Sequence, residues 1–449
     1  MTHPKHFNTI VVGVGAMGSA TCYYTAKRGK RVLGLEQFDI PNHRGSSHGH
    51  TRIIRLAYYE HPSYVMLLKR AYELFHELEN RTGEKVLHYT GSIDAGPADS
   101  WVFKGAFQSA TLYDLPHEVL TGVELTKRFP GYRFPHDIMA LYQPQGGFLT
   151  PEKCIVSYVT AASALGAEIH GREKVLRYEP TPSGGVRVIT DRDEYFADSL
   201  VITAGAWDAK LLPHLRGLAV PERQVLAWLQ PQKPELFTTS NFPVFNVLVP
   251  EGRFYGFPQY AIPGFKFGKY HHFEEVGNPD TLIQGDDGEP RPDDEAMLRE
   301  FAGRYFPDAT GPTMSLASCM FTNTPDGHFI IDQHPTMPQV AYASPCSGHG
   351  WKFTSVIGEV LAEIADLGHS RWDIGLFRAD RFGVPVSNLF RDKGAPPRVK
   401  VEAGDPFGIQ GAGRTTASSG RKTADGGRRT ADDTRDPRFW TRNAVTPFW

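Results

Sequence analysis

The chain has 449 residues, 40% of them hydrophobic and 12% aromatic, which is enough for two globular domains or one large domain with insertions. Its formal net charge of −2 leaves no basic surface of the kind that binds nucleic acid or a membrane, and no apolar run is long enough to span a bilayer. Its four cysteines are scattered without a C-x-x-C pair and no signal peptide precedes the first predicted strand, so we expect a cytoplasmic protein with neither a disulfide scaffold nor a nucleic-acid or membrane partner.

The first predicted elements are a strand, a glycine turn and a helix. The apolar run Phe7–Val12 predicts a buried parallel strand, and a helix is expected over Met17–Arg28. Gly13, Gly15 and Gly18 have the spacing G-x-G-x-x-G. In a dinucleotide-binding turn the first glycine permits the sharp bend, the second lets the backbone approach a pyrophosphate, and the third lets helix and strand pack closely. The N-terminus of the helix would hold the pyrophosphate.

A second strand is expected over Arg31–Leu35. It ends at Glu36, whose carboxylate is placed to accept hydrogen bonds from an adenosine ribose. Strand, turn, helix and acid together predict a dinucleotide site rather than a glycine turn that only packs. They do not choose among NAD, NADP and FAD.

The chain up to residue 166 combines a polar loop, two helices and an insertion. The segment Pro41–Arg55 is unusually rich in side chains that donate hydrogen bonds to anions. Ser63 is expected to cap a helix over residues 64–80. Residues 85–148, rich in proline, glycine and short mixed strands, indicate an insertion into the nucleotide domain. Thr150, followed by proline at the first helical position, predicts the cap of the next helix.

Strands dominate the middle of the chain. The run Leu200–Trp207 predicts a buried strand that returns to the first sheet and ends in small residues, which leave room for a bound cofactor. Residues 221–319 predict a second, β-rich domain of antiparallel character, interrupted by a helix at about 293–306. The other strands are expected at 167–170, 186–190, 194–203, 224–230, 245–249, 254–257 and 265–270.

The C-terminal part begins with buried strands at 329–332 and 339–343. The glycine loop Cys346–Lys352 then opens a helix over 353–367, which predicts a second site for an anion or a carbonyl group. Residues 386–449 lack a hydrophobic pattern and are expected to form a mostly disordered tail.

Other chemistries find little support in the residues. No G-x-S-x-G elbow follows a strand, which argues against a serine hydrolase. The histidines at 48, 50, 271 and 272 lack the spacing of zinc ligands, so no metal site is expected. Lys266, between Phe265 and Phe267 on a predicted strand, is either an ordinary exposed lysine or a cation held over a pocket. Arg52, Arg55 and Lys352 are further candidate cations.

Several motifs follow one another in a defined order over residues 7–382. They are Ile10–Gly18, Gly45–Arg55, Ala204–Trp207, Tyr255–Pro258, Lys266–Gly268, Cys319, Pro325–Asp332 and Ser347–Phe353. In this order they resemble the monomeric sarcosine oxidase/N-methyltryptophan oxidase family of flavoproteins, which have a glutathione-reductase-like fold of the D-amino-acid-oxidase type. The stretches Gly96–Ser100 and Gln224–Gln230 lean towards the N-methyltryptophan branch.

The resemblance implies an α/β fold with a Rossmann-like FAD-binding domain and a second substrate domain built on an antiparallel β-rich sheet. The FAD-binding domain would be discontinuous and comprise residues 1–90, 150–218 and 320–385. Residues 91–149 and 219–319 would form the substrate domain. A monomer with bound FAD is expected.

The resemblance also implies roles around the flavin. Cys319 would carry FAD covalently through the flavin 8-methyl carbon, and His48 and Arg52 would lie against one flavin face, with Thr51 in the same loop. Lys266 would assist the reduction of O2, where a fixed positive charge is favourable. The residues expected to bind the cofactor are Gly13, Gly15, Ala16, Met17, Gly18, Glu36, His48, Thr51, Arg52, Val175, Gly205, Trp207, Cys319, Gly348, Gly350 and Lys352.

For the substrate, Arg55 and Lys352 would clamp a carboxylate, a role that suits two converging cations. Tyr255 would line the pocket near the substrate amine. The residues expected to take part in catalysis are Lys266, Arg52, His48 and Tyr255.

Four positions depart from the family pattern. His50 replaces an acid, Tyr270 replaces a histidine, Phe321 lacks a hydroxyl group present in relatives, and Tyr59 stands where relatives carry glycine. These changes leave the flavin chemistry in place but put the identity of the substrate in doubt.

The sequence thus predicts an FAD-dependent oxidase of secondary amino acids, with an N-methyl or cyclic amino acid and O2 as substrates and an imine and H2O2 as products. A flavin-dependent amine dehydrogenase that uses another electron acceptor, an NAD-linked dehydrogenase and a non-catalytic nucleotide-binding protein are the alternatives.

Overall fold

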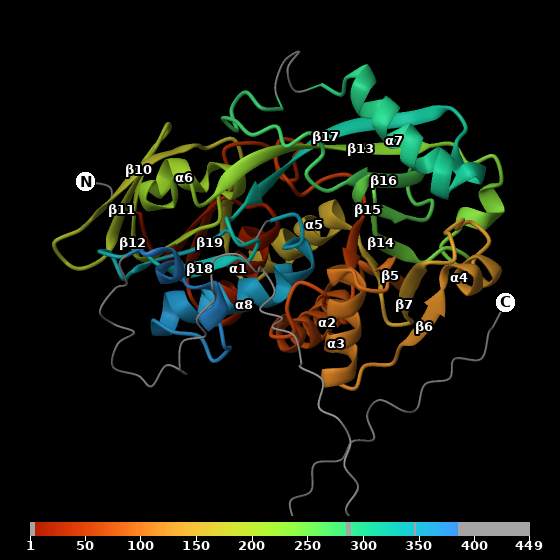
Figure 1. Cartoon of the computed structure of the whole chain (residues 1–449). Coiled ribbons are helices and arrows are strands. Elements are labelled where there is room, and N and C mark those ends of the chain that lie inside the picture. Colours follow the sequence, from red (N-terminus) through yellow and green to blue (C-terminus); the bar gives the residue numbers. More distant parts are fainter. Residues whose placement is uncertain (1–4, 284–288, 345–346, 385–449) are drawn as a thin grey trace, which may run out of the picture. The chain divides into compact units, whose positions relative to one another are not determined.

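The computed structural model describes residues 5–283, 289–344 and 347–384, whose strands form three sheets (Figure 1). The first sheet is built around β1 (His6–Val12), which pairs in parallel with β2 (Val32–Leu35) and β12 (Glu194–Ile202). β9 (Glu168–His170) continues the parallel sheet beyond β2, and β19 (Val340–Ser344) continues it beyond β12. The carboxyl ends of these strands therefore meet at one edge, where the glycine turn begins.

Antiparallel strands complete this sheet. β10 (Val175–Pro180) and β11 (Val186–Thr190) form a hairpin that extends from β12. β18 (Ile330–Gln333) pairs with β19. The first sheet is therefore mixed, with a parallel centre.

Helices cover one region of the first sheet and pack on one another (Figure 1). α1 (Ala16–Lys27) contacts both α5 (Pro151–Ser163) and α8 (Thr354–Leu367), and α2 (Tyr64–Thr82) packs against α8. The approach of α1 and α8 depends on Gly358, because a Cβ atom there would lie only 2.5 Å from the Cβ of Ala20. This packing holds the N-terminus of α1 at the edge of the sheet.

The second sheet has the strand order β17-β13-β16-β15-β14-β5-β7-β6. Its neighbours run antiparallel except for β14 and β5, which pair in parallel. Segments from both sides of residue 150 thus share one sheet, which α3, α4 and α7 flank. The bounds are β5 Ser92–Pro97, α3 Trp101–Leu112, β6 Glu118–Thr121, α4 Gly122–Arg128, β7 Ile138–Gln143, β13 Val220–Leu229, β14 Val244–Val249, β15 Gly252–Phe257, β16 Phe265–Lys269, α7 Pro292–Tyr305 and β17 Thr313–Asn323.

A small third sheet has the order β3-β8-β4. β3 (Arg52–Ile54) and β4 (Leu87–Tyr89) both pair antiparallel with β8 (Gly147–Leu149). This sheet joins the start of the predicted insertion to its end and fixes the loop that carries Arg52.

The predicted fold class is confirmed, and the main strands and helices lie within a few residues of their expected bounds. Two helices, α3 and α4, form in the segment 85–148 where the sequence pattern does not predict them, and β10 is a further strand that it does not predict. α4 carries a signal that could have revealed it, because Thr121 and Glu124 form a capping box.

Two predicted helix caps are wrong. Ser63 precedes α2 but has helical backbone angles, φ −57° and ψ −20°, and its side chain makes no cap hydrogen bond. An N-cap side chain needs an extended backbone to reach the first free N–H groups. Thr150 precedes α5, but its hydroxyl donates to the carbonyl oxygen of Val86 at 3.4 Å instead.

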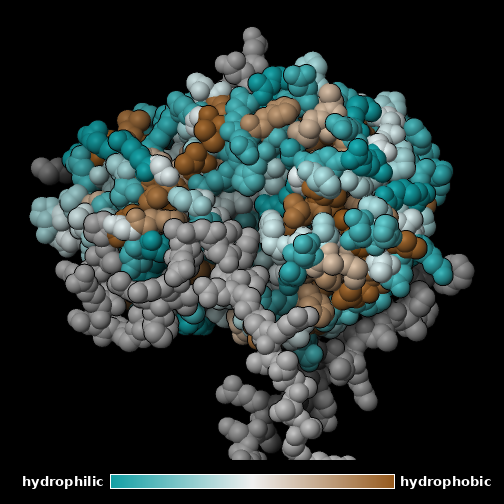
Figure 2. Space-filling view, viewed as in Figure 1, coloured by the Kyte–Doolittle hydropathy of each residue, from teal (hydrophilic) through white to brown (hydrophobic). Residues whose placement is uncertain are grey.

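Within the described residues, no helix is long and apolar enough to cross a membrane. On the face shown in Figure 2, hydrophobic residues form small groups separated by hydrophilic ones. The expected tail, residues 386–449, lies outside the described residues, as do residue 385 and Cys346.

Candidate active site

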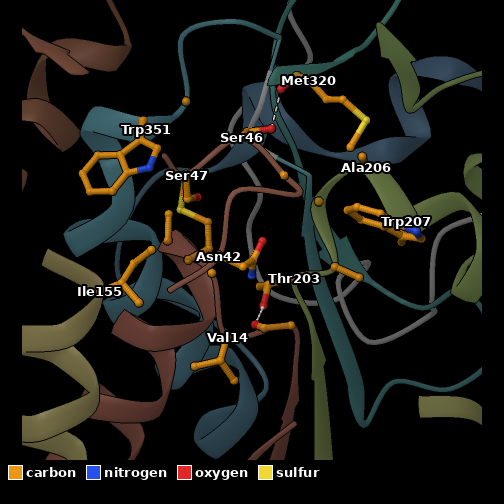
Figure 3. Close-up of a pocket in the computed structure, with 18 of the residues that line it drawn as sticks. Val14, Asn42, Ser46, Ser47, Ile155, Thr203, Ala206, Trp207, Met320 and Trp351 are labelled. Atoms are coloured by element: carbon orange, nitrogen blue, oxygen red, sulfur yellow. Dashed lines mark hydrogen bonds between the residues drawn. The ribbon is translucent and has the colours of Figure 1, made fainter. Parts of the chain in front are cut away.

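A cavity of about 440 Å³ begins at the glycine turn after β1 and reaches β17 of the second sheet. Figure 3 shows Trp207 and Trp351 on opposite sides of it, with Asn42 and Thr203 between them. The predicted site residues that line it are Gly13, Gly15, Ala16, Met17, Glu36, Arg52, Val175, Gly205, Trp207, Tyr255, Cys319, Gly348, Gly350 and Lys352. Gly18, His48, Thr51, Arg55 and Lys266 are not among its lining residues.

The three glycines of the turn differ in what surrounds them. Gly13 has φ +87°, and a Cβ atom there would lie 2.5 Å from the carbonyl oxygen of Thr203. A Cβ at Gly18 would lie 1.8 Å from the carbonyl oxygen of Gly13, so this position serves the packing of helix on strand. At Gly15 the nearest atom is Oγ of Ser47 at 3.8 Å, which leaves the backbone open to the cavity.

The N-terminus of α1 faces this opening. Gly15 is its N-cap and supplies no side-chain hydrogen bond, so the N–H groups of the first turn keep their capacity to bind an anion. Because backbone donors, a glycine cradle and a dipole of the right sign coincide here, the residues fit the pyrophosphate of a dinucleotide.

Glu36 closes β2 and borders the cavity. Its Oε2 accepts a hydrogen bond from the backbone N–H of Val14 at 2.9 Å, and its Oε1 accepts one from Phe38 at 3.0 Å. Burial raises the pKa of this carboxyl group, and the backbone donors oppose that shift. The carboxylate is therefore held in one orientation beside the turn.

Cys319 lies at the other end of the cavity, on β17, and is 2% exposed. Burial raises the pKa of its thiol, while Arg52 and Lys266 act in the opposite direction. The neighbouring Met320 accepts a hydrogen bond from the hydroxyl group of Ser46, which ties the polar loop to β17 (Figure 3).

Two cations lie close together at this end of the cavity, Arg52 among its lining residues and Lys266 behind them. Lys266 is 2% exposed, which excludes an ordinary surface lysine, and its Nζ donates to the carbonyl oxygens of Gly49 and Thr51 at 2.7 and 2.8 Å and to the hydroxyl group of Thr51 at 2.9 Å. Burial and then Arg52 lower its pKa well below the usual value. Arg52 donates to the carbonyl oxygens of Thr51 and Ser46, each at 2.8 Å.

His48 belongs to the same loop. It is buried, its Nε2 atom has no hydrogen-bond partner among the described residues, and burial followed by Arg52 lowers its pKa to about 3. The ring is therefore neutral at physiological pH. A buried polar atom without a protein partner is compatible with a ligand at this position.

The expected carboxylate clamp contains two cations of different character. Lys352 lines the cavity, donates to the carbonyl oxygen of His349 at 2.7 Å and has a pKa that burial lowers to about 7. Arg55 is 1% exposed, and its Nη2 donates to Glu60 at 2.8 Å while its Nε lies 3.4 Å from Asp94. Both cations approach the Tyr58 ring, at 4.5 Å for the Arg55 guanidinium and 5.3 Å for the Lys352 Nζ.

Sequence reasoning missed the carboxylates around Arg55. Asp94 is fully buried in β5, and burial raises its pKa to about 6 against the influence of Arg55. The side-chain amide of Asn246 donates to Asp94 at 3.0 Å, and the hydroxyl group of Tyr270 donates to Asn246 at 3.4 Å. An acid at the centre of an otherwise buried strand is a signal that could have drawn attention to Asp94.

Three of the four positions that depart from the family pattern, Tyr59, Tyr270 and Phe321, lie in the same region. Tyr270 lines the cavity, and its ring centroid lies 5.0 Å from that of Tyr255 and 5.7 Å from that of Phe321. The Tyr59 ring centroid lies 3.9 Å from the guanidinium of Arg55. His50 is exposed, and its backbone N–H donates to Glu152.

No group of three or more His, Cys, Asp or Glu side chains among the described residues is placed to hold a metal ion.

The parallel sheet, the glycine cradle at its edge and the long cavity define a dinucleotide-dependent enzyme. Residues 8–364 match the family model described as DAO, FAD dependent oxidoreductase, and the chain belongs to this family. It is therefore an FAD-dependent oxidoreductase.

Individual relatives are more specific. The chain is 40% identical over 379 residues to a monomeric sarcosine oxidase of Bacillus sp. (strain NS-129), which covers 84% of this chain and 97% of that protein. It is 34% identical over 377 residues to an N-methyl-L-tryptophan oxidase of Yersinia pestis (strain Pestoides F), with 84% and 99% covered.

Solved structures share the fold. NikD, described as an unusual amino acid oxidase, has a TM-score of 0.71 at 24% identity and covers 86% of this chain and 98% of its own. L-proline dehydrogenase from P. horikoshii has a TM-score of 0.72 at 19% identity, with 85% and 99% covered.

Proposed function

We propose that this protein is an FAD-dependent oxidase of secondary amino acids, with an N-methyl or cyclic amino acid as the substrate class. The observation that carries the proposal is the single cavity that joins the glycine cradle to a wall bearing Cys319, Tyr255, Arg52 and Lys352. The names of the relatives, monomeric sarcosine oxidase and N-methyl-L-tryptophan oxidase, support the substrate class.

FAD would be held by backbone groups at one end of the cavity and by side chains at the other. Gly13, Gly15 and the first turn of α1 would bind the pyrophosphate, and Glu36 would accept from the ribose. Cys319 would form the covalent bond to the flavin. When bound, FAD accepts two electrons from the C–N bond of the amine and passes them to O2, which yields an imine and H2O2.

Of the two cations of the expected clamp, Lys352 is the better placed to receive the substrate carboxylate, because it lines the cavity and its ammonium group donates to a carbonyl oxygen rather than to a carboxylate. Arg55 would join it as the second cation of the clamp after giving up part of its interaction with Glu60 or Asp94. Tyr255 would border the amine. The amine reacts in its neutral form, so the rate of flavin reduction at saturating substrate should rise towards alkaline pH, and a flat profile of this rate would contradict this part of the proposal.

Lys266 would assist the reduction of O2. Its ammonium group is fixed by three oxygen atoms of the loop 49–51, so a positive charge would be held in place without further reorganisation. Arg52, which lines the cavity, and His48 would lie between this cation and the flavin.

We further propose a division into an FAD-binding and a substrate domain, which the presence of two large sheets supports. Residues 1–90, 150–218 and 320–385 would form the first domain, and residues 91–149 and 219–319 the second. We also propose that the protein is a cytoplasmic monomer with a small-molecule substrate, a state supported by the name of the sarcosine oxidase relatives.

The deciding experiment offers the purified yellow protein a panel of N-methyl and cyclic amino acids in air and measures H2O2 together with substrate loss. We expect stoichiometric peroxide with at least one member. Turnover that requires an artificial electron acceptor would favour the amine dehydrogenase, and bound FAD without turnover under either condition would favour a non-catalytic binding protein. Primary amino acids of equal size serve as the matched control.

A further inference from the structure

A second cavity, of about 560 Å³, adjoins the FAD cavity. Tyr270 and His349 line both cavities, so the two cavities meet at these side chains. Glu60, the partner of Arg55, also lines the second cavity. We call it the outer cavity. It borders both the expected carboxylate clamp and the expected position of the substrate.

Arg253 of β15 is one of two cations, with Lys269, that line the outer cavity. Its guanidinium carbon lies 3.5 Å from the ring centroid of Tyr270, 5.0 Å from that of Trp101 and 5.9 Å from that of Tyr59. No described residue forms a hydrogen bond or an ion pair with this guanidinium. Aromatic rings thus orient the group while its N–H donors remain available, which is the arrangement that binds a carboxylate with little loss of side-chain entropy.

The acids of the described outer cavity form no ion pair with Arg253, and most pair with other cations, although Arg253 contributes to lowering the pKa of Glu60. Glu60 pairs with Arg55 at 2.8 Å, Asp326 accepts from Arg381 at 2.7 Å, and Glu251 pairs with Arg304.

Two other charged groups line the outer cavity without a partner among the described residues, the cation Lys269 and the exposed acid Glu274. With Arg253 this leaves two available cations and one available acid. At the expected carboxylate clamp, by contrast, Arg55 is not available in this way, because two carboxylates already flank it. A second anionic group of a ligand therefore finds available donors on the outer side of Tyr270.

We propose that Arg253 is a specificity-determining residue that binds a second, distal carboxylate of the substrate in the outer cavity. The preferred substrates are then N-alkylated dicarboxylic amino acids, with the α-carboxylate on Lys352 and Arg55 and the distal carboxylate on Arg253. This inference rests on the proposed function and narrows its substrate class.

The kinetic test compares kcat/KM for N-methyl-L-glutamate and N-methyl-L-aspartate with kcat/KM for N-methyl-L-alanine. We expect the wild type to prefer a dicarboxylic substrate, and Arg253→Gln to lower the ratio of dicarboxylic to monocarboxylic kcat/KM by about tenfold or more, mainly through KM. Arg253→Lys keeps the charge and should restore part of the ratio. An unchanged ratio in Arg253→Gln would overturn the inference.

Arg128→Gln is the matched control. Arg128 also stacks on a tyrosine, with its guanidinium 4.4 Å from the Tyr142 ring centroid, but it pairs with Glu118 and lines neither cavity. Its substitution should leave the ratio unchanged.

A binding measurement separates this inference from the proposed function. Glutarate and butyrate, which cannot be oxidised as amines, are titrated into the FAD-bound protein while the flavin absorbance is followed. If glutarate binds more tightly than butyrate and this difference disappears in Arg253→Gln, the inference is supported. This holds even if no amine is turned over, a result that would contradict only the proposed function. Equal affinity of the two acids for the wild type would overturn the inference whatever the turnover.

Discussion

The two ends of the FAD cavity are built in different ways. At the glycine turn, Gly13, Gly15 and Glu36 lie within 24 consecutive residues, and most of the binding groups belong to the backbone. At the far end, Arg52, Tyr255, Cys319 and Lys352 come from four separate segments, and the roles proposed for them belong to their side chains. The proposed nucleotide cradle can thus be predicted from spacing, whereas the proposed catalytic residues come together only after the sheets have assembled.

The ends also differ in charge. The turn carries one acid, Glu36, whose two oxygens accept backbone hydrogen bonds. Behind the far end the hydrogen-bond acceptors of Lys266 are a hydroxyl and two carbonyl oxygens, and none is a carboxylate. Burying a cation without a carboxylate partner costs stability, so a function of the cation is a reason for keeping it there. This contrast supports a role in chemistry at the far end and a role in binding at the turn.

The largest expected effect concerns the turn. Gly18→Ala places a Cβ atom where the carbonyl oxygen of Gly13 lies 1.8 Å away, so the helix must shift. We expect a loss of about 3 kcal/mol or more in the free energy of unfolding, with little FAD bound after purification. Thermal unfolding and the ratio of flavin to protein absorbance measure both effects.

Gly303→Ala is the control for this substitution. Gly303 lies in α7, and a Cβ atom added there would have no neighbouring atom within 4 Å, so alanine should leave stability unchanged or raise it by about 1 kcal/mol. If the Gly18→Ala protein were as stable as this control and bound as much FAD, the backbone of the turn would not have the role that distinguishes it from the far end.

At the far end, Cys319→Ala should abolish the retention of flavin by acid-precipitated protein without preventing folding. The thiol is the group proposed to bond the flavin, and removing one buried sulfur atom costs little packing. Flavin absorbance of the pellet measures the flavin that stays bound to the precipitated protein, and absorbance of the supernatant measures the flavin that is released. Cys154→Ala, another buried cysteine, is the control. Equal retention in the wild type and in Cys319→Ala would exclude the proposed bond.

Lys266→Met should slow flavin reoxidation by O2 by about 10² to 10³-fold while flavin reduction by the amine changes only a few-fold, because the charge acts on the oxygen step. Stopped-flow absorbance separates the two half-reactions. Lys233→Met, an exposed lysine that pairs with Asp308, is the control. Equal slowing of both half-reactions would remove the assigned role.

The smallest expected effect tests Lys352. Because its pKa is lowered to about 7, the ammonium group is charged below pH 7 and loses its charge as the pH rises. The Kd of butyrate, whose own charge does not change in this range, should therefore increase by roughly tenfold between pH 6 and pH 8. Flavin absorbance titrations measure it. The pH dependence should disappear in Lys352→Met, and its persistence there would show that another group titrates.

The structure also shows which features local sequence patterns predict correctly and which they do not. The strand, turn and helix at residues 6–27 are predicted within two residues, because their pattern depends only on neighbouring positions. The predicted caps at Ser63 and Thr150 are wrong. In the folded chain Ser63 has helical backbone angles, and the hydroxyl group of Thr150 donates to Val86, which is distant in sequence. The roles given to the site residues stay predictions.

The sequence by itself determined the nucleotide cradle, the order of the main strands and helices and the family, because these depend on short-range spacing and on motifs kept in order. Only the tertiary structure decided that Lys266 is buried, that Arg55 lies between Glu60 and Asp94 and that Arg253 stacks on Tyr270. The physical reason is that burial and charge pairing arise between segments far apart in the chain. β14, for example, pairs with β5 across about 150 residues and brings Asn246 to Asp94.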